Sequence, residues 1–137
     1  YSDTRTKIEY SRLVKEDAER ALALDPGYAW AHHVLGRWHY EVALLGATTR
    51  FFVRLAYGGL PPGSNAEAIS HLEQAVALDP QTLAHHVELG FALLVAGREA
   101  DARDAFSRGL ALPSREKHDA DAKARARRAL TRLGPAA

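Results

Sequence analysis

The chain repeats part of itself at a fixed distance, and this recurrence limits the folds that it can adopt. Ala23-Leu24-Asp25-Pro26 recurs as Ala77-Leu78-Asp79-Pro80, and Leu35-Gly36 recurs as Leu89-Gly90. Both recurrences are 54 residues apart, so the two units are in register. Recurrence at a fixed separation is typical of arrays in which each repeat buries its apolar face on its neighbour.

Within each unit the apolar residues follow helical spacing. Ala and Leu recur at separations of three and four residues, whereas the alternation and β-branched runs of strands are missing. The pattern predicts an all-α fold, with helices over about residues 7–24, 28–44, 64–79, 82–96, 99–112 and 115–133. Ser64 and Glu67 also have the spacing of a capping box, in which each residue's side chain accepts from the other's backbone N–H.

These landmarks fit the tetratricopeptide pattern, whose period is about 34 residues. In the later unit Gly90 is followed at the expected separations by a small residue, a large one and another small one: Ala102, Phe106 and Gly109. In the earlier unit the same sequence of sizes comes later, at Ala68, Leu72 and Ala75. A single insertion of about 20 residues, roughly over 45–64, explains both this delay and the longer period.

We therefore predict one tetratricopeptide-like helical-hairpin solenoid over residues 1–137. Its parts are the second helix of repeat one (7–26), repeat two with the insertion (27–80), repeat three (81–113) and a C-terminal capping helix (114–133). Gly36 and Gly90 should lie where the two helices of a hairpin approach closely. The capping helix is basic and should present a solvated outer face.

Composition and spacing argue against catalysis and metal binding. The chain has no Cys, which excludes thiolate nucleophiles and zinc-thiolate sites. Neighbouring histidines such as His32 and His33, or His85 and His86, point about 100° apart on a helix and cannot chelate one ion. No phosphate-binding loop or nucleophile paired with a base is evident. We predict a protein that is not an enzyme and carries neither cofactor nor metal.

The charge and the hydropathy of the chain argue against nucleic acid as a partner and against a membrane span. Eighteen Lys and Arg against 17 Asp and Glu give no field that would favour nucleic acid, and the basic last helix lacks aromatic residues for stacking. No apolar run is long enough to span a bilayer, so we predict a soluble chain and leave its compartment open. A start at Tyr1 without any Met favours a fragment or a processed product.

The register predicts which residues line the concave groove. The first helix of each hairpin should contribute Trp30, His33, Arg37 and Tyr40 in repeat two, and Phe91, Leu94 and Val95 in repeat three. The groove would then be polar and aromatic at one end and apolar at the other. Such a surface suits a ligand with an apolar body and a polar end, such as an amphipathic helix or a lipid.

The insertion carries a short amphipathic segment. Arg50 and Arg54 are one helical turn apart, and Phe51 belongs to the opposite side. We expect this segment to fold onto the groove as a lid; direct contact with a lipid is the alternative.

The chain resembles the regulator of microtubule dynamics family. The resemblance rests on Ala-Leu-Asp-Pro before a helix with Leu35-Gly36-x-Trp38-x-Tyr40, on Arg50-x-x-x-Arg54, and on Pro61-Pro62-Gly63-Ser64 closing the insertion. It implies a tetratricopeptide-like helical domain without catalytic residues. Animal members are known as microtubule-associated proteins, and one mitochondrial member binds phospholipid through this domain. The Ala- and Arg-rich composition is typical of a bacterial member, so we do not transfer microtubule binding.

Two functions follow from this interpretation. The first is a scaffold that binds a protein or peptide partner in its concave groove. The alternative is a lipid carrier that holds an acyl chain against Phe91, Leu94 and Val95, with Arg37, Arg50 or Arg54 at the head group.

Overall fold

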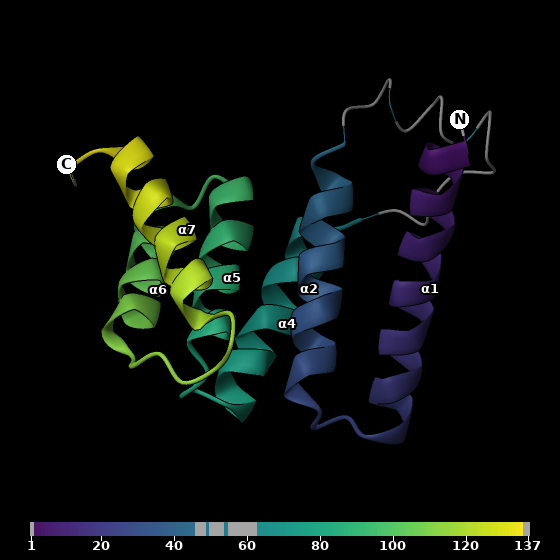
Figure 1. Cartoon of the computed structure of the whole chain (residues 1–137), viewed down its shortest axis with the longest axis horizontal. Coiled ribbons are helices and arrows are strands. Elements are labelled where there is room, and N and C mark those ends of the chain that lie inside the picture. The colour runs from purple at the N-terminus through teal and green to yellow at the C-terminus, as the bar shows by residue number, and fades with distance from the viewer. Residues whose placement is uncertain (1, 46–48, 50–53, 55–62, 136–137) are drawn as a thin grey trace.

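The regular secondary structure of the protein is helical. The computed structural model describes residues 2–45, 49, 54 and 63–135, and no strand occurs within these ranges (Figure 1). The prediction of an all-α chain is therefore confirmed. The main helices are α1 (Ser2–Leu24), α2 (Ala29–Ala43), α4 (Asn65–Leu78), α5 (Leu83–Val95), α6 (Glu99–Ala111) and α7 (Asp119–Leu133). The predicted insertion lies almost wholly outside the described residues.

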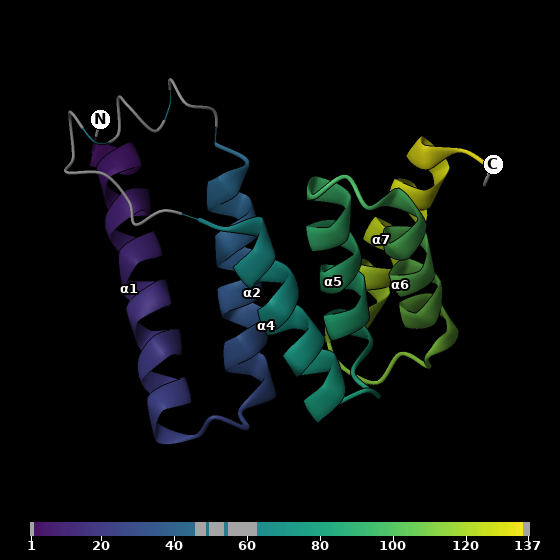
Figure 2. The ribbon, with the colours of Figure 1, turned by 180° about the vertical axis from the view of Figure 1, so that it is seen from behind.

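The helices stand in a row, with each packed on the one before it. Helix α1 packs on α2, α2 on α4, α4 on α5, and α5 on α6, while α7 packs on both α5 and α6. Figures 1 and 2 show this row from opposite sides, with α1 at one end and α6 and α7 at the other. Contacts also join α2 directly to α5, so the two hairpins share one core.

Two hairpins, α2–α4 and α5–α6, are each closed at a glycine. A Cβ atom on Gly36 would lie 2.4 Å from Cγ of Leu72, and one on Gly90 would lie 2.5 Å from ring atoms of Phe106. The side chains of Leu72 and Phe106 are both completely buried. Each glycine therefore lets a large side chain of the second helix reach the backbone of the first, as the register predicts.

A histidine bond also recurs in the two hairpins. Nε2 of His32 lies 2.9 Å from the carbonyl oxygen of Pro26, and Nε2 of His86 lies 2.8 Å from that of Pro80. Because a carbonyl can only accept, Nε2–H donates in both bonds. Each histidine thus ties the first helix of its hairpin to the turn before it.

Two helices begin at positions that the periodicity does not predict. Helix α1 begins at Ser2, five residues earlier than expected, and Arg5 pairs with Glu9 across one turn of this extension. Helix α7 begins at Asp119, later than the expected start at Arg115. The buried carboxylate of Asp119 accepts bonds of 2.8 Å from the backbone N–H groups of Arg115 and Glu116, which holds that stretch in a turn.

Only half of the predicted capping box forms at the start of α4. Oγ of Ser64 accepts from the backbone N–H of Glu67 at 3.2 Å, as expected. The prediction of the reciprocal bond, from the N–H of Ser64 to the Glu67 side chain, was wrong. The N–H of Ser64 donates instead to Nδ1 of His39 at 3.2 Å. The carboxylate of Glu67 instead lies 3.8 Å from Nε2 of His39. None of the described helices is long and apolar enough to cross a membrane.

Candidate functional site

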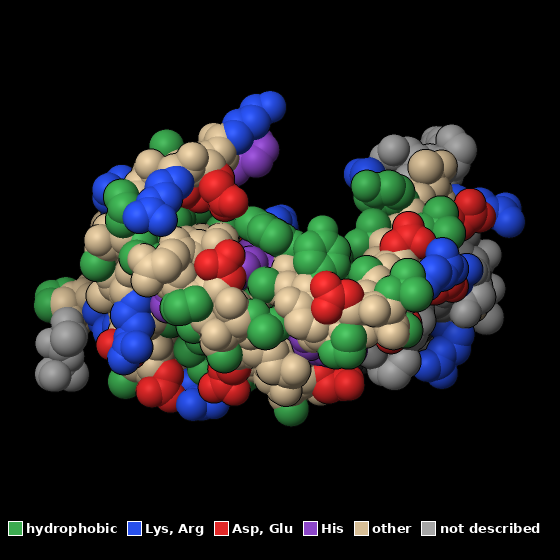
Figure 3. Space-filling view, turned by 90° about the horizontal axis from the view of Figure 1, so that it is seen from below, with side chains coloured by type: hydrophobic (Ala, Val, Ile, Leu, Met, Phe, Trp, Pro, Cys, Tyr) green, Lys and Arg blue, Asp and Glu red, His purple; other side chains and the backbone are tan. Residues whose placement is uncertain are grey.

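One face of the molecule is hollow. Figure 3 shows it as a depression between an arm on the α7 side and an arm on the α1 side, with hydrophobic side chains along its floor. Two pockets and a buried polar cluster organise this part of the structure. We call the pockets the α1–α2 pocket, between those two helices, and the arginine pocket, between α5 and α7.

The α1–α2 pocket has a volume of about 330 Å³. Helix α2 contributes Trp30, His33 and Arg37, which share one face because they are three and four residues apart. Helix α1 contributes Tyr10 and Val14 from the opposite wall. Tyr10 is 68% exposed and Trp30 is 36% exposed, so two large aromatic side chains remain accessible to a ligand.

A hydrogen bond between Trp38 of α2 and Ser11 of α1 joins the two helices that form the pocket. The indole Nε1–H of Trp38 donates to Oγ of Ser11 at 2.9 Å and lies 3.1 Å from the Ser11 carbonyl oxygen. Nζ of Lys15, also on α1, lies over the Trp38 ring, 5.4 Å from its centre. Trp38 therefore fixes α1 against α2, while Trp30, two turns earlier, is left free to form a wall.

Behind Trp30 lies a pair of buried histidines. Nδ1 of His33 is 2.9 Å from Nδ1 of His85, so one nitrogen must donate and the other accept. The Trp30 ring covers both, with ring centres 4.7 Å from His33 and 4.8 Å from His85. Burial lowers the pKa of each histidine to about 4, with further lowering from Arg37 at His33 and from His33 itself at His85.

Glu88 assigns the protons of this pair. Its carboxylate lies 3.9 Å from Nε2 of His33, which favours a proton on that nitrogen. Nδ1 of His33 then accepts from Nδ1–H of His85. Nε2 of His85 is left as a buried lone pair without a hydrogen-bond partner among the described residues. With the protons in these places, the nitrogen left unpaired is an acceptor and not an N–H donor. Buried N–H groups without a partner are the rarer of the two in proteins.

Glu88 itself is only 2% exposed, and it is satisfied from two other helices. The Tyr40 hydroxyl on α2 donates to Oε1, and Nη1 of Arg125 on α7 lies 3.6 Å from Oε2. Burial and the neighbouring Glu88 carboxylate raise the pKa of Tyr40, which keeps the phenol protonated as a donor. A buried carboxylate needs such compensation, since an isolated charge in the interior is very costly.

The arginine pocket lies on the far side of Glu88. It has a volume of about 260 Å³ and is lined by Phe91 of α5 and by Arg125, Arg128, Ala129 and Arg132 of α7. The guanidinium of Arg125 lies 4.6 Å from the centre of the Phe91 ring, within cation–π range. Glu88 thus stands between the two pockets, because His33 lines one and Arg125 lines the other.

The predicted groove residues are divided among these places. Trp30, His33 and Arg37 line the α1–α2 pocket, and Phe91 lines the arginine pocket. Tyr40 is only 5% exposed, and its hydroxyl is engaged by Glu88, so it supports the site from within.

Three further residues of the predicted site can be placed, two from the groove and one from the insertion. Leu94 and Val95 are partly buried against the core. Arg54 is exposed. Arg50 and Phe51 lie outside the described residues.

Sequence reasoning missed Glu88, His85 and Arg125 as members of the site. Glu88 offered a signal, because it is the one acidic residue in helix α5, whose other residues are apolar apart from His85 and His86. An ionised group in such a helix needs a partner. Chemically the cluster is a neutralised, hydrogen-bonded support. No group of three or more His, Cys, Asp or Glu in the described part of the chain could hold a metal ion.

Comparison with known proteins places the chain in context. The profile of the family described as "Regulator of microtubule dynamics protein 1-3" matches residues 1–134. Regulator of microtubule dynamics protein 3 of Xenopus laevis is 36% identical over 74 residues, which cover 54% of this chain and 16% of that protein. Regulator of microtubule dynamics protein 1 of Bos taurus is 32% identical over 81 residues, or 58% of this chain and 25% of the relative.

The human regulator of microtubule dynamics protein 1 is 26% identical over 80 residues. That match covers 58% of this chain and 26% of the human protein. The chain therefore spans about a quarter or less of the length of these relatives. All three relatives are named as regulators.

Proposed function

Because the chain belongs to the regulator of microtubule dynamics family, we propose that it is a non-enzymatic, tetratricopeptide-like scaffold whose α1–α2 pocket binds a helical segment of a protein partner. The observation that carries this proposal is the pair of accessible aromatic side chains, Tyr10 and Trp30, on facing walls of a 330 Å³ pocket. Aromatic residues in partly desolvated pockets are the usual anchors of protein interfaces.

The position of α1 supports a helical occupant. Among the helices that the structure describes, α4 and α6 each pack on two neighbours, whereas α1 packs mainly on α2. Helix α1 exposes a second large apolar side chain besides Tyr10, because Leu13 is 55% exposed. An amphipathic helix laid along α1 would cover these residues with anchors at helical spacing, in the way that helix-in-groove complexes form.

Site-specific photocrosslinking tests the proposal. The photoreactive residue p-benzoylphenylalanine would replace Tyr10 in the pocket, or Tyr28 as a matched control that is 49% exposed and does not line the pocket. We expect a discrete protein adduct at position 10 in the host cell and none at position 28. Equal adducts at both positions, or none at position 10, would contradict the proposal.

A peptide selected against the purified protein from a display library gives a second test of the same pocket. Trp30→Ala should weaken its binding about tenfold or more, as loss of an aromatic anchor does. Tyr28→Ala should leave binding unchanged. A peptide that binds wild type and Trp30→Ala equally well would place the interface elsewhere.

Lipid binding is the second candidate function. It is favoured by one observation: the arginine pocket sets cationic groups beside the aromatic ring of Phe91. Native mass spectrometry of the purified protein tests it. A co-purifying lipid whose binding is lost in Arg128→Gln would support a carrier, and a protein without bound lipid would oppose it.

A further inference from the structure

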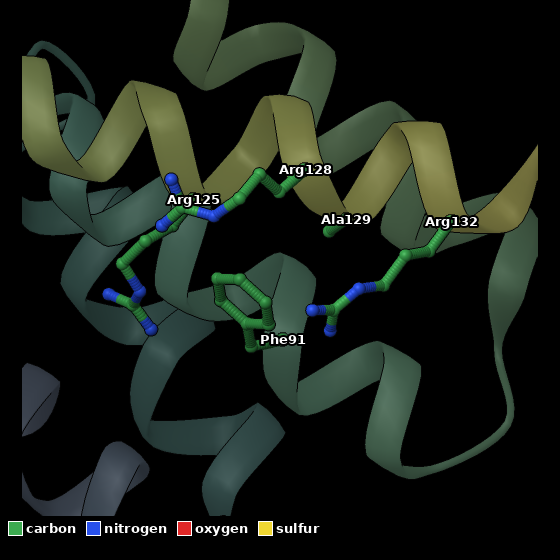
Figure 4. Close-up of a pocket in the computed structure, with 5 residues that line it drawn as sticks. All are labelled: Phe91, Arg125, Arg128, Ala129 and Arg132. Carbon is green, nitrogen blue, oxygen red and sulfur yellow. The ribbon is translucent and has the colours of Figure 1, made fainter.

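The arginine pocket concentrates positive charge on one face of α7. Arg125, Arg128 and Arg132 are three and four residues apart, so they share that face. Figure 4 shows the Phe91 ring between the guanidinium groups of Arg125 and Arg132, with Arg128 extending above it. Over seven residues of helix this row of cations extends for about 10 Å.

Most of this charge is not neutralised by the residues that the structure describes. Glu88 lies 3.6 Å from Arg125, but Arg128 and Arg132 are exposed and form no ion pair with any residue that the structure describes. On the neighbouring helix α6, by contrast, Arg103 pairs with Glu99 and Arg108 with Asp104. Arg115 and Arg127 are also exposed and have no ion pair among the described residues, so what distinguishes Arg128 and Arg132 is that both line a pocket beside Arg125.

We propose that the arginine pocket binds neighbouring carboxylates of an acidic segment in a protein partner. Guanidinium groups bind carboxylates through paired, charge-assisted hydrogen bonds, and three of them in a row offer places for several acidic side chains. A row about 10 Å long is matched by consecutive acidic residues of a peptide, whereas one phosphate would reach only part of it. The face of Phe91 receives the apolar stem of the central side chain.

This inference rests on the proposed function in one respect: both assume that the ligand is a segment of a protein partner. It concerns a different pocket, formed by different helices, from the one that holds Tyr10 and Trp30. Failure of the crosslinking test at position 10 would therefore leave it standing, and its own failure would leave the α1–α2 pocket unaffected.

The test is binding of a fluorescent pentaglutamate peptide to the whole chain, with a pentaglutamine peptide for comparison. We expect only the glutamate peptide to bind. The double variant Arg128→Gln, Arg132→Gln should weaken binding about tenfold or more, because it removes two of the three charge-assisted contacts. Arg127→Gln is the matched control: it removes the same charge from an exposed residue on the same helix that does not line the pocket.

Each result decides the matter. Tenfold weaker binding in the double variant, with Arg127→Gln within about twofold of wild type, supports the site. Diffuse attraction acts on each charge alike, so the loss of one charge in Arg127→Gln would then weaken binding about threefold. Weakening of about threefold or more in Arg127→Gln, or equal binding of the two peptides, overturns it. Tighter binding of inorganic phosphate, or of vesicles that contain anionic lipid, than of the glutamate peptide overturns the assignment to a peptide. Circular dichroism checks that the variants remain helical.

Discussion

The hairpins α2–α4 and α5–α6 are alike inside and different on their inner surfaces. Both close at a glycine against one large buried side chain, and both carry a histidine bonded to the proline carbonyl six residues before it. Their first helices differ in what covers them. Helix α2 presents Trp30 and Arg37 to an open pocket, whereas α5 lies beneath α7, which places Arg125 over Phe91.

This difference shows that the repeated sequence determines the contacts inside each hairpin, whereas the helices beside the hairpin determine which of its surfaces stay exposed. The contact residues inside a hairpin recur with the repeat because two helices must approach at the same place in each unit. The surface that remains open depends on which helix comes before or after the hairpin. On α2 that neighbour is α1 and on α5 it is α7, so the equivalent positions Arg37 and Phe91 line two different pockets, one beside the aromatic residues of α1 and α2 and the other beside the arginines of α7.

The largest expected effect tests the likeness of the two hairpins. Phe106→Ala should lower the free energy of unfolding by about 3–5 kcal/mol and Leu72→Ala by about 2–5 kcal/mol, because each leaves a cavity beside its glycine. Urea denaturation measures both, with Leu24→Ala, at an 84% exposed position, as the control that should change little. A loss far smaller at one site than at the other would show that the two positions are not equivalent.

A second prediction tests the histidine pair that joins the two hairpins. Burial lowers the pKa of His33 and His85 from 6.5 to about 4. Between these values the unfolded chain binds more protons, so this contribution to stability is complete above pH 6.5 and is lost as the pH falls toward 4. The loss should be roughly 3 kcal/mol for each histidine, from 1.36 kcal/mol for each pKa unit.

Urea unfolding at a series of pH values measures this loss. The double variant His33→Leu, His85→Leu should lose most of the pH dependence in that range. His118→Gln, at an exposed position, should keep it. An unchanged dependence in the double variant would assign the titration to other groups.

The smallest expected effect distinguishes the two recurrent histidine bonds. His86→Phe keeps a ring but leaves the Pro80 carbonyl without its donor, which should cost about 1 kcal/mol. His32→Phe should cost more, because Nδ1 of His32 also lies 3.0 Å from Nδ1 of His71. Thermal unfolding of the two variants side by side measures the order, and a greater loss for His86→Phe would reverse this interpretation.

Much of the fold was predictable because its determinants are local or recur. Helical spacing and the Asp-Pro turns place most helix ends within a residue or two, and the register identifies Gly36 and Gly90 as close contacts. The start of α7 and the hydrogen bonds that cap α4 differed from the prediction because they depend on particular side chains. The start of α7 depends on the carboxylate of Asp119, and the cap of α4 depends on His39, which is 25 residues away in the chain.

The site was only partly predictable, because its members come from distant segments. The helix face with Trp30, His33 and Arg37 follows from spacing alone. The environment of Glu88 does not, since Tyr40 is 48 residues before it and Arg125 comes from α7. Sequence spacing tells which residues share a face of one helix, but the partner of a buried charge is set by how separate helices pack.

The neutralisation of Glu88 also determines how the chain can be divided. Its carboxylate relies on a phenol from α2 and a guanidinium from α7. A version cut after α6 would keep both complete hairpins yet leave the buried carboxylate without Arg125, the arginine that pairs with it. The last helix is therefore an integral part of the folding unit, and trimming from the C-terminal end should be all-or-none, unlike the stepwise shortening that modular arrays tolerate.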